Sequence, residues 1–297
     1  MNIRKHIYNN HWTLGFIESP IGEILNGKPY NVRWLDNPYN NRWFADPFLL
    51  FVDGKEIHVL VEEFYDPINR GRISRLIIDR KSLLIKSITP ILELPTHLSF
   101  PAIIRDDDKV YIYPENSASG NLDLYLYSPD SNKCEFVKNL CKQPLTDAIC
   151  TSIWGEKLIF STQLPTQNKN VLSYYAINSD SFSKSGEIIF NSNIARNAGD
   201  WFVLNGDVFR PAQDCTKRYG GAVIIQKVIK QKDSFSFENI IRIEEKYANY
   251  TLGCHTFNYL DGIAVIDVNG YRRPLIANTI KRITALRITI AKLCHAK

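Results

Sequence analysis

Carboxylate side chains recur where predicted strands begin, and residues of this type suit acid–base chemistry. Asp46 precedes Pro47 at the start of an apolar run, and Asp147 opens a second such run. Glu115 ends a third run, and His255 begins a later one. Carboxylates that share one channel drive their pKa values apart, which favours general acid–base catalysis. Asp46, Asp147 and Glu115 are therefore the candidate catalytic residues, although for each one alone a turn or capping role is the competing interpretation.

A dense polar segment between residues 196 and 220 supplies most of the candidate substrate-binding residues. Arg196 and Arg210 could each bind a phosphate or a carboxylate through two parallel hydrogen bonds. Gln213 and Asp214 could bind sugar hydroxyls. An internal ion pair between Arg210 and Asp214, or with an acid of a neighbouring element, is an equally good interpretation. Further candidate binding residues lie at other predicted strand starts: Trp43, His97, His255 and Thr256.

Five similar hairpins must position these residues, each made of an apolar strand, a tight polar turn and a second apolar strand. The turns are marked by Asp53, Asp107, Gly155, Asn205 and Asp261. Successive turns lie about 54, 48, 50 and 56 residues apart, a spacing typical of propeller blades. The sequence therefore predicts an all-β fold, a five-bladed β-propeller, whose inner strands start around one axis and bring together residues distant in sequence.

The repeat divides the chain into three parts. Residues 1–40 are predicted to form an N-terminal segment with a strand that closes the ring, and residues 41–270 to form the propeller. Residues 271–297 contain no acidic residue and place apolar side chains three to four positions apart, which predicts a short basic amphipathic helix. This helix could lie on an anionic membrane surface, or its apolar stripe could pack on the flank of the propeller.

Composition and charge narrow the class of protein. The chain has a net charge of +5 and 44% hydrophobic residues, as in ordinary globular proteins, and we expect no membrane-spanning helix. The N-terminus lacks the apolar stretch of a secretory signal, and the six cysteines show no metal-binding spacing. We therefore expect a cytoplasmic protein with no metal site, no cofactor and no nucleic-acid partner, and peripheral contact of the tail with the inner membrane face stays open beside its packing on the propeller.

A series of short motifs resembles the N-terminal propeller domain of the glucosamine inositolphosphorylceramide transferases and its stand-alone bacterial relatives. The motifs follow the family's order over residues 40–270: Trp43-Phe-Ala-Asp-Pro-Phe, His97-Leu-Ser-Phe-Pro, Tyr113-Pro-Glu, Arg196-x-Ala-Gly, Arg210-Pro-x-Gln-Asp-Cys, Tyr219-Gly and Gly253-x-His-Thr-Phe-Asn. The resemblance implies a five-bladed propeller with a role in the assembly of surface polysaccharides or glycolipids.

More distantly, Asp46 followed by Pro47, with Asp147 two blades later, resembles the five-bladed propellers of glycoside hydrolase family 43. That resemblance implies a base role for Asp46 and an orienting role for Asp147. The acid of that family stands in a Glu-Gly-Pro or Glu-Ala-Pro motif, but this chain reads Arg196-Asn-Ala-Gly there. A leaving glycosidic oxygen needs a carboxylic acid to protonate it. A calcium ion in the channel, as some related propellers hold, stays open as an alternative.

Three functions are consistent with these residues. The first is a glycosyl or related group transferase of cell-surface polysaccharide or glycolipid biosynthesis, with Asp46 as the base. In it, Arg196, Arg210 and His255 would bind an anionic donor or a lipid phosphate. The second is a family-43-type glycoside hydrolase in which Glu115 replaces the missing acid. The third is a non-catalytic glycan-binding module. The expected ligand is a glycan or a sugar phosphate.

Overall fold

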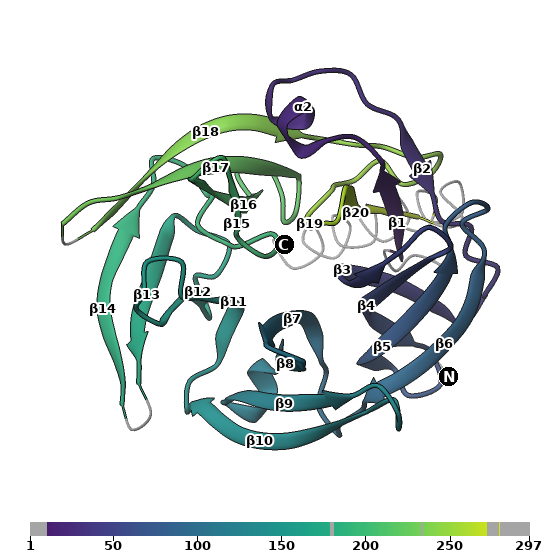
Figure 1. The fold of residues 1–297 in the computed structure, drawn as a ribbon, viewed down its shortest axis with the longest axis horizontal. Coiled ribbons are helices and arrows are strands. Elements are labelled where there is room, and N and C mark those ends of the chain that lie inside the picture. The colour runs from purple at the N-terminus through teal and green to yellow at the C-terminus, as the bar shows by residue number, and fades with distance from the viewer. Residues whose placement is uncertain (1–10, 179–180, 233, 272–278, 280–297) are drawn as a thin grey trace, which may run out of the picture.

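The computed structural model confirms the five-bladed β-propeller (Figure 1). It describes residues 11–178, 181–232, 234–271 and 279. Five four-stranded antiparallel sheets stand around a common axis, and each sheet is one blade. The basic amphipathic helix predicted over 271–297 lies outside the described residues, except for Tyr271 and Thr279.

The blades follow one another along the chain, each starting with its innermost strand. Blade one contains β3 (Arg42–Val52), β4 (Glu56–Tyr65), β5 (Arg70–Asp79) and β6 (Ile85–Leu92). Blade two contains β7 (Ser99–Asp106), β8 (Lys109–Glu115), β9 (Leu122–Ser128) and β10 (Lys133–Cys141), with a 3₁₀ turn η1 (Ser117–Ser119) after β8. Blade three contains β11 (Leu145–Thr151), β12 (Leu158–Gln163), β13 (Val171–Ile177) and β14 (Phe182–Ile189). Blade four contains β15 (Phe202–Leu204), β16 (Asp207–Asp214), β17 (Ala222–Lys230) and β18 (Phe235–Ile243).

Blade five joins the two ends of the described chain. It combines β19 (Phe257–Leu260) and β20 (Ile263–Gly270) with the N-terminal strands β1 (His11–Ile17) and β2 (Val32–Trp34). β1 pairs with β20 along its whole length, so the strand expected within residues 1–40 does close the ring. A short helix, α2 (Ile21–Leu25), connects β1 to β2. No helix among the described residues is long and apolar enough to cross a membrane.

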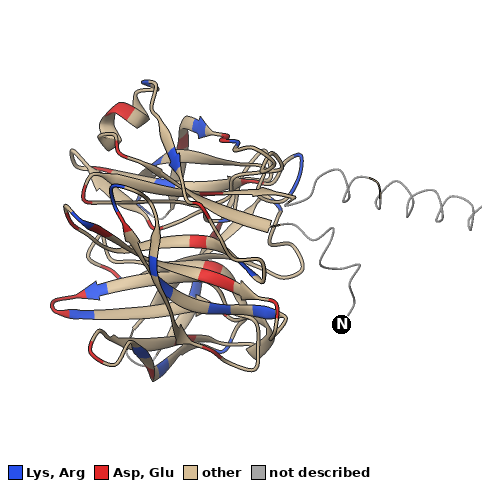
Figure 2. Ribbon diagram, turned by 90° about the vertical axis from the view of Figure 1, so that its right-hand side faces the viewer, with Lys and Arg blue, Asp and Glu red and all other residues tan. Residues whose placement is uncertain are grey.

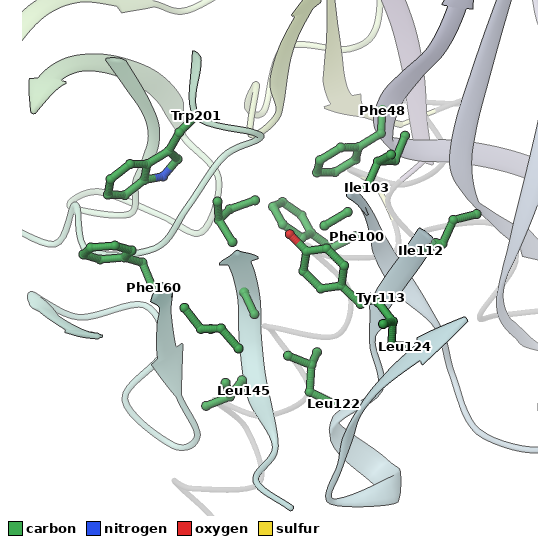
Figure 3. Packing of buried hydrophobic residues seen from close by; sticks show 14 of the residues in the cluster. Phe48, Phe100, Ile103, Ile112, Tyr113, Leu122, Leu124, Leu145, Phe160 and Trp201 are labelled. Atoms are coloured by element: carbon green, nitrogen blue, oxygen red, sulfur yellow. The ribbon is translucent and has the colours of Figure 1, made fainter. Parts of the chain in front are cut away.

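The hydrophobic core fills the spaces between neighbouring blades. Figure 3 shows part of the largest cluster, in which Phe48 of blade one meets Phe100 of blade two edge-to-face, with ring centroids 4.9 Å apart. Phe160 of blade three packs against Trp201 at the start of blade four with the rings tilted by 35° and their centroids 4.4 Å apart. Because these contacts join residues from different blades, the core fixes the blades around the axis and with them the inner strand starts.

The innermost strands of blades one, two and three carry the same irregularity. Asp46, Phe100 and Asp147 have left-handed backbone angles, with φ of 48°, 45° and 43°, and the strand register slips beside each of them. A bulge residue leaves the strand ladder, so its N–H needs another acceptor. Asp46 N–H donates to Asp267 at 2.9 Å, and Phe100 N–H donates to Asp46 at 3.0 Å. Asp147 N–H donates to Glu115 at 3.0 Å, so the bulges hold three carboxylates beside the axis.

Candidate functional site

Asp46 lies at the centre of the candidate site. The residue is 5% exposed and lies at the bulge of β3. One carboxylate oxygen accepts the N–H of Phe100, and the other lies 3.1 Å from the hydroxyl of Thr256 and 3.5 Å from Nε2 of His255. Burial raises the pKa of Asp46 to about 7, against the opposing effect of His255. Asp46 can therefore accept or hold a proton at neutral pH.

His255 is fixed between two aspartates. Its Nδ1 lies 2.8 Å from Asp267 Oδ1, which turns Nε2 toward Asp46. The indole of Trp12, from β1, stacks on the imidazole with ring centroids 3.8 Å apart. Burial alone would lower the pKa of His255, but Asp267 and Asp46 raise it to about 9. His255 is thus a buried imidazolium at neutral pH, placed to share a proton with Asp46.

Asp267 is the residue of this cluster that sequence reasoning missed. Its Oδ1 accepts the N–H groups of His255 and Thr256 at 3.1 and 3.0 Å, and its Oδ2 accepts the N–H of Asp46. It stands in the fully buried strand β20, far from any predicted strand start. A single acid inside an apolar strand was the available signal, because a buried carboxylate must be hydrogen-bonded.

Asp147 forms a second carboxylate group across the axis. It is 2% exposed, pairs with Arg196 Nε, and accepts a hydrogen bond from Gln213 Nε2 at 2.8 Å. Burial raises the pKa of Asp147 to about 7, with Arg196 acting against the rise and Glu115 adding to it. Glu115 itself is engaged by the backbone of Asp147 and by the hydroxyl of Ser117, at 3.0 and 2.9 Å.

Arg210 does not join these groups at the axis. Its side chain is fully buried, with Phe190 and Phe237 beside the guanidinium. Its nitrogens donate to Asn197 Oδ1 at 2.8 Å, to Gln226 Oε1 at 2.6 Å and to the carbonyls of residues 194 and 195. Burial lowers its pKa to about 9. Arg210 therefore stabilises the start of blade four, and it reaches Asp147 only through Asn197, whose Nδ2 donates to the Asp147 carbonyl at 2.8 Å.

Asp214 also lies apart from the axial carboxylates. It pairs with Arg242 of β18, and the internal pair with Arg210 considered above is wrong. Trp43 lies instead at the start of blade one, and His97 lies just before the first strand of blade two. His97 Nε2 is 3.2 Å from Glu62 Oε1, and Trp43 stacks on Phe64 with centroids 5.0 Å apart.

Negative charge predominates at the axis. The carboxylates of the site are Asp46, Glu62, Glu115, Asp147 and Asp267. Among the described residues they face two strong cations, Arg196 and His255, which are both already paired with aspartates. They also face His97, which pairs with Glu62 and whose pKa Glu62 raises against the effect of burial. Elsewhere, acidic and basic residues are mixed along the strands and turns, as the edge-on view in Figure 2 shows. A phosphate at the axis would therefore meet net repulsion, whereas neutral hydroxyl groups would find acceptors.

The site does not fit the calcium ion kept open above. Asp46, His255 and Asp267 each offer a ligand atom within 4.8 Å of the others. Calcium takes six to eight oxygen ligands. Both oxygens of Asp267, however, already accept hydrogen bonds from backbone N–H groups, and the third group is an imidazole.

The fold and site define a five-bladed β-propeller with buried carboxylates at its axis. The chain belongs to the family described as "Glucosamine inositolphosphorylceramide transferase 1, N-terminal", whose family model matches residues 32–258. It is 27% identical over 193 residues to Glucosamine inositolphosphorylceramide transferase 1 of Arabidopsis thaliana, which covers 61% of this chain and 25% of that protein. The protein of the same name from Oryza sativa subsp. japonica is 29% identical over 143 residues, covering 45% of this chain and 19% of that protein. The chain thus matches a quarter or less of these relatives' length.

Solved structures share the fold at low sequence identity. A family 117 glycoside hydrolase of the marine bacterium Zobellia galactanivorans superposes with a TM-score of 0.51 at 10% identity, covering 77% of this chain and 84% of that one. A GH43 beta-xylosidase/alpha-arabinofuranosidase from a compost microbial metagenome gives a TM-score of 0.51 at 12% identity, covering 77% and 86%. At these identities the likeness shows the five-bladed architecture alone.

Proposed function

We propose that this chain is a carbohydrate-active protein of cell-surface polysaccharide or glycolipid biosynthesis that carries out a glycosyl or related group transfer at the propeller axis. The observation that carries the proposal is the pair of enclosed aspartates, Asp46 and Asp147, each with a pKa raised to about 7 by burial. A general base works best when its pKa lies near the working pH. The family membership supports the carbohydrate class of ligand.

In this proposal Asp46 takes the proton of an acceptor hydroxyl, whose oxygen bonds to the anomeric carbon of a donor sugar, while the bond from that carbon to the donor's phosphate breaks and the phosphate leaves with the electron pair. His255 Nε2 lies 3.5 Å from the Asp46 carboxylate, and Asp267 holds the opposite ring nitrogen. The imidazolium therefore stabilises the ionised form of Asp46 that must receive the proton. Asp147 would orient the sugar, with its own carboxylate held by Arg196 and Gln213.

The charge balance revises the expected ligand at the axis. Arg210 is enclosed and Arg196 is paired with Asp147, so neither is free to bind a phosphate as expected from the sequence. We propose a neutral glycan as the axial ligand, with any phosphate of a donor or lipid outside the carboxylate cluster. The cytoplasmic location and the membrane contact of residues 271–297 stay predictions.

The test is calorimetric titration with neutral oligosaccharides, nucleotide sugars and lipid-phosphate analogues. We expect saturable binding of a neutral oligosaccharide, with an affinity that falls at least about tenfold in Asp46→Asn, since a charged hydrogen bond is lost. Asp108→Asn, in an exposed turn, is the matched control. Equal binding by wild type and Asp46→Asn would instead support a non-catalytic glycan-binding module.

Hydrolysis remains the second proposal. Glu115 lies beside Asp147, as an altered acid would require, but both of its oxygens accept hydrogen bonds from the protein. An acid must donate a proton to the leaving oxygen, so this geometry disfavours Glu115 in that role. Release of reducing sugar from an oligosaccharide in water, lost in Glu115→Gln, would establish the hydrolase and overturn the transferase.

A further inference from the structure

Glu62 and Glu63 are consecutive residues of β4 with opposite surroundings. Glu63 is fully buried and saturated: Arg42 and Arg72 pair with it at 2.7 and 2.8 Å, and the hydroxyl of Ser74 donates to it at 2.6 Å. Glu62 faces the other side of the sheet, toward blade two, and its side chain is 8% exposed. Within the described part of the chain it meets one polar side chain, that of His97, at Oε1. Its second oxygen accepts no hydrogen bond from the described residues and is not among their fully enclosed polar atoms, so it is open to solvent or to a ligand.

His97 orients this carboxylate. The N–H of Gly71 donates to His97 Nδ1 at 2.9 Å, which places the ring proton on Nε2, 3.2 Å from Glu62 Oε1. A Cβ at position 71 would lie 2.4 Å from the carbonyl oxygen of Leu98, 2.8 Å from His97 Cε1 and 2.9 Å from Glu62 Oε1, so glycine leaves room for this backbone and for the pair beside it. The side chain of His97 is 47% exposed, so the pair reaches solvent. Gly71 therefore leaves space for the His97–Glu62 pair that the side chain of any other residue would occupy.

Two aromatic rings lie on the same face of blade one. Trp43 is paired with Phe64 across β3 and β4, two positions from the pairing of Ala45 with Glu62, and side chains two positions apart share a face. The Trp43 and Phe64 rings are stacked within 6° of parallel, and the Phe64 ring lies 6.4 Å from the His97 ring. Flat rings beside a hydrogen-bond acceptor suit a sugar, which has an apolar face and hydroxyl edges.

We propose that Glu62, oriented by His97 and flanked by Trp43 and Phe64, forms a second sugar-binding subsite on the blade-one side of the axial carboxylates. The ring hydroxyls of a pyranose donate to the unpaired oxygen of Glu62, and its apolar face packs on the aromatic pair. Asp46 directly follows Ala45, the partner of Glu62 in the sheet, so the subsite adjoins the axial carboxylates. It takes the sugar unit next to the one at Asp46. The inference rests on the proposed function, because it assumes that the ligand is a glycan.

The test is a glycan-array screen followed by calorimetry. The glycan that wild-type protein binds most tightly on the array is titrated into Glu62→Gln, Trp43→Ala, Asp46→Asn and, as the control, Glu238→Gln on the exposed edge of blade four. We expect Glu62→Gln to bind about tenfold or more weakly, because a charged hydrogen bond is lost, with Trp43→Ala weakened and Glu238→Gln unchanged. Glu62→Gln should melt at or above the wild-type temperature, because the substitution removes a buried charge without a strong cation.

The other outcomes separate the two proposals. Wild-type affinity in both Glu62→Gln and Trp43→Ala, together with loss in Asp46→Asn, would overturn the subsite and leave the proposed function standing. If Glu62→Gln fails to fold, Trp43→Ala decides alone: unchanged affinity overturns the subsite, and weakened affinity supports it. A wild-type protein that binds no glycan on the array overturns both.

Discussion

Asp46 and Asp147 occupy equivalent bulges in blades one and three, with φ of 48° and 43°, and both carboxyls are almost completely enclosed. Asp tolerates the left-handed region better than most residues, because its short side chain bonds to nearby backbone. The two positions differ in their cation: His255 lies beside Asp46, and Arg196 pairs with Asp147. The same type of strand bulge thus places two carboxyl groups beside different cationic partners.

The stability of the fold should fall as the pH rises from about 4 to about 7. The pKa of Asp46 and of Asp147 is raised from 3.8 to about 7, so between these values the folded state holds more protons than the unfolded chain. The pKa of His255 is raised from 6.5 to about 9, so its contribution is complete below 6.5 and is lost as the pH passes through 9. Urea unfolding at several pH values in this range measures how the free energy of unfolding depends on pH. In Asp46→Asn this dependence should be weaker between about pH 4 and pH 7. An identical slope in Asp46→Asn would show that Asp46 titrates normally.

Replacement of Asp267 should destabilise the fold strongly. The carboxylate of Asp267 accepts the backbone N–H groups of His255 and Asp46 and contacts the imidazolium of His255. In Asp267→Asn the amide N–H₂ group would face one or more of these donors, and the imidazolium would lose its anionic partner. We expect a loss of about 3 kcal/mol or more in the free energy of unfolding. Chemical denaturation measures it, with Asp108→Asn as the exposed control. A loss no greater than that of the control would show that this hydrogen-bonded group does not stabilise blade five.

Substitution of Arg210 should lower the stability of the fold, whereas substitution of Arg196 should mainly change ligand affinity. Arg210→Lys leaves several buried acceptors unpaired and should cost about 3 kcal/mol of stability. Arg196→Lys keeps the charge beside Asp147 but loses the contact with Asn168, so it should change ligand affinity more than the melting temperature. Thermal melting and calorimetry of both variants make the comparison. If Arg210→Lys melts like the wild type and loses ligand binding, Arg210 belongs to the ligand site after all.

Gly71→Ala should be destabilising, by about 1–3 kcal/mol, because the added methyl group overlaps the backbone carbonyl oxygen of Leu98 and the side chains of His97 and Glu62. Gly54→Ala is the matched control, since nothing lies within 4 Å of a Cβ there. Differential scanning calorimetry of the two variants tests the claim. Equal melting temperatures would show that the backbone at Leu98 and the His97 side chain both move aside at no cost.

The blades could be predicted because their signals are local. Each polar turn between two apolar strands is a short-range pattern, and the turns at Asp107, Asn205 and Asp261 carry the positive φ angles that such residues adopt. The strand that closes the ring could also be predicted, because the last sheet of a propeller needs a strand from the other end of the chain. The three bulges were not predicted, because a register slip depends on the partner strand.

The candidate site was predictable only where it coincides with strand starts. Asp46, Asp147 and His255 were found in this way, and the structure brings Asp46 and His255 into contact and places Asp147 across the axis. Glu62 and Asp267 were missed because each stands inside a second strand, in β4 and β20. In such strands the direction of a side chain depends on pairing.

The sequence by itself determined the number of blades, the turns between their strands and the residue types at the inner strand starts, because these are set by neighbours along the chain. The tertiary structure alone decided which of these groups are enclosed and what they contact. Arg196 and Arg210 are alike as residues, yet one pairs with a carboxylate of the preceding blade and the other is sealed among carbonyls and aromatic rings. The reason is that burial and charge depend on groups supplied by different blades, which meet only when the ring closes.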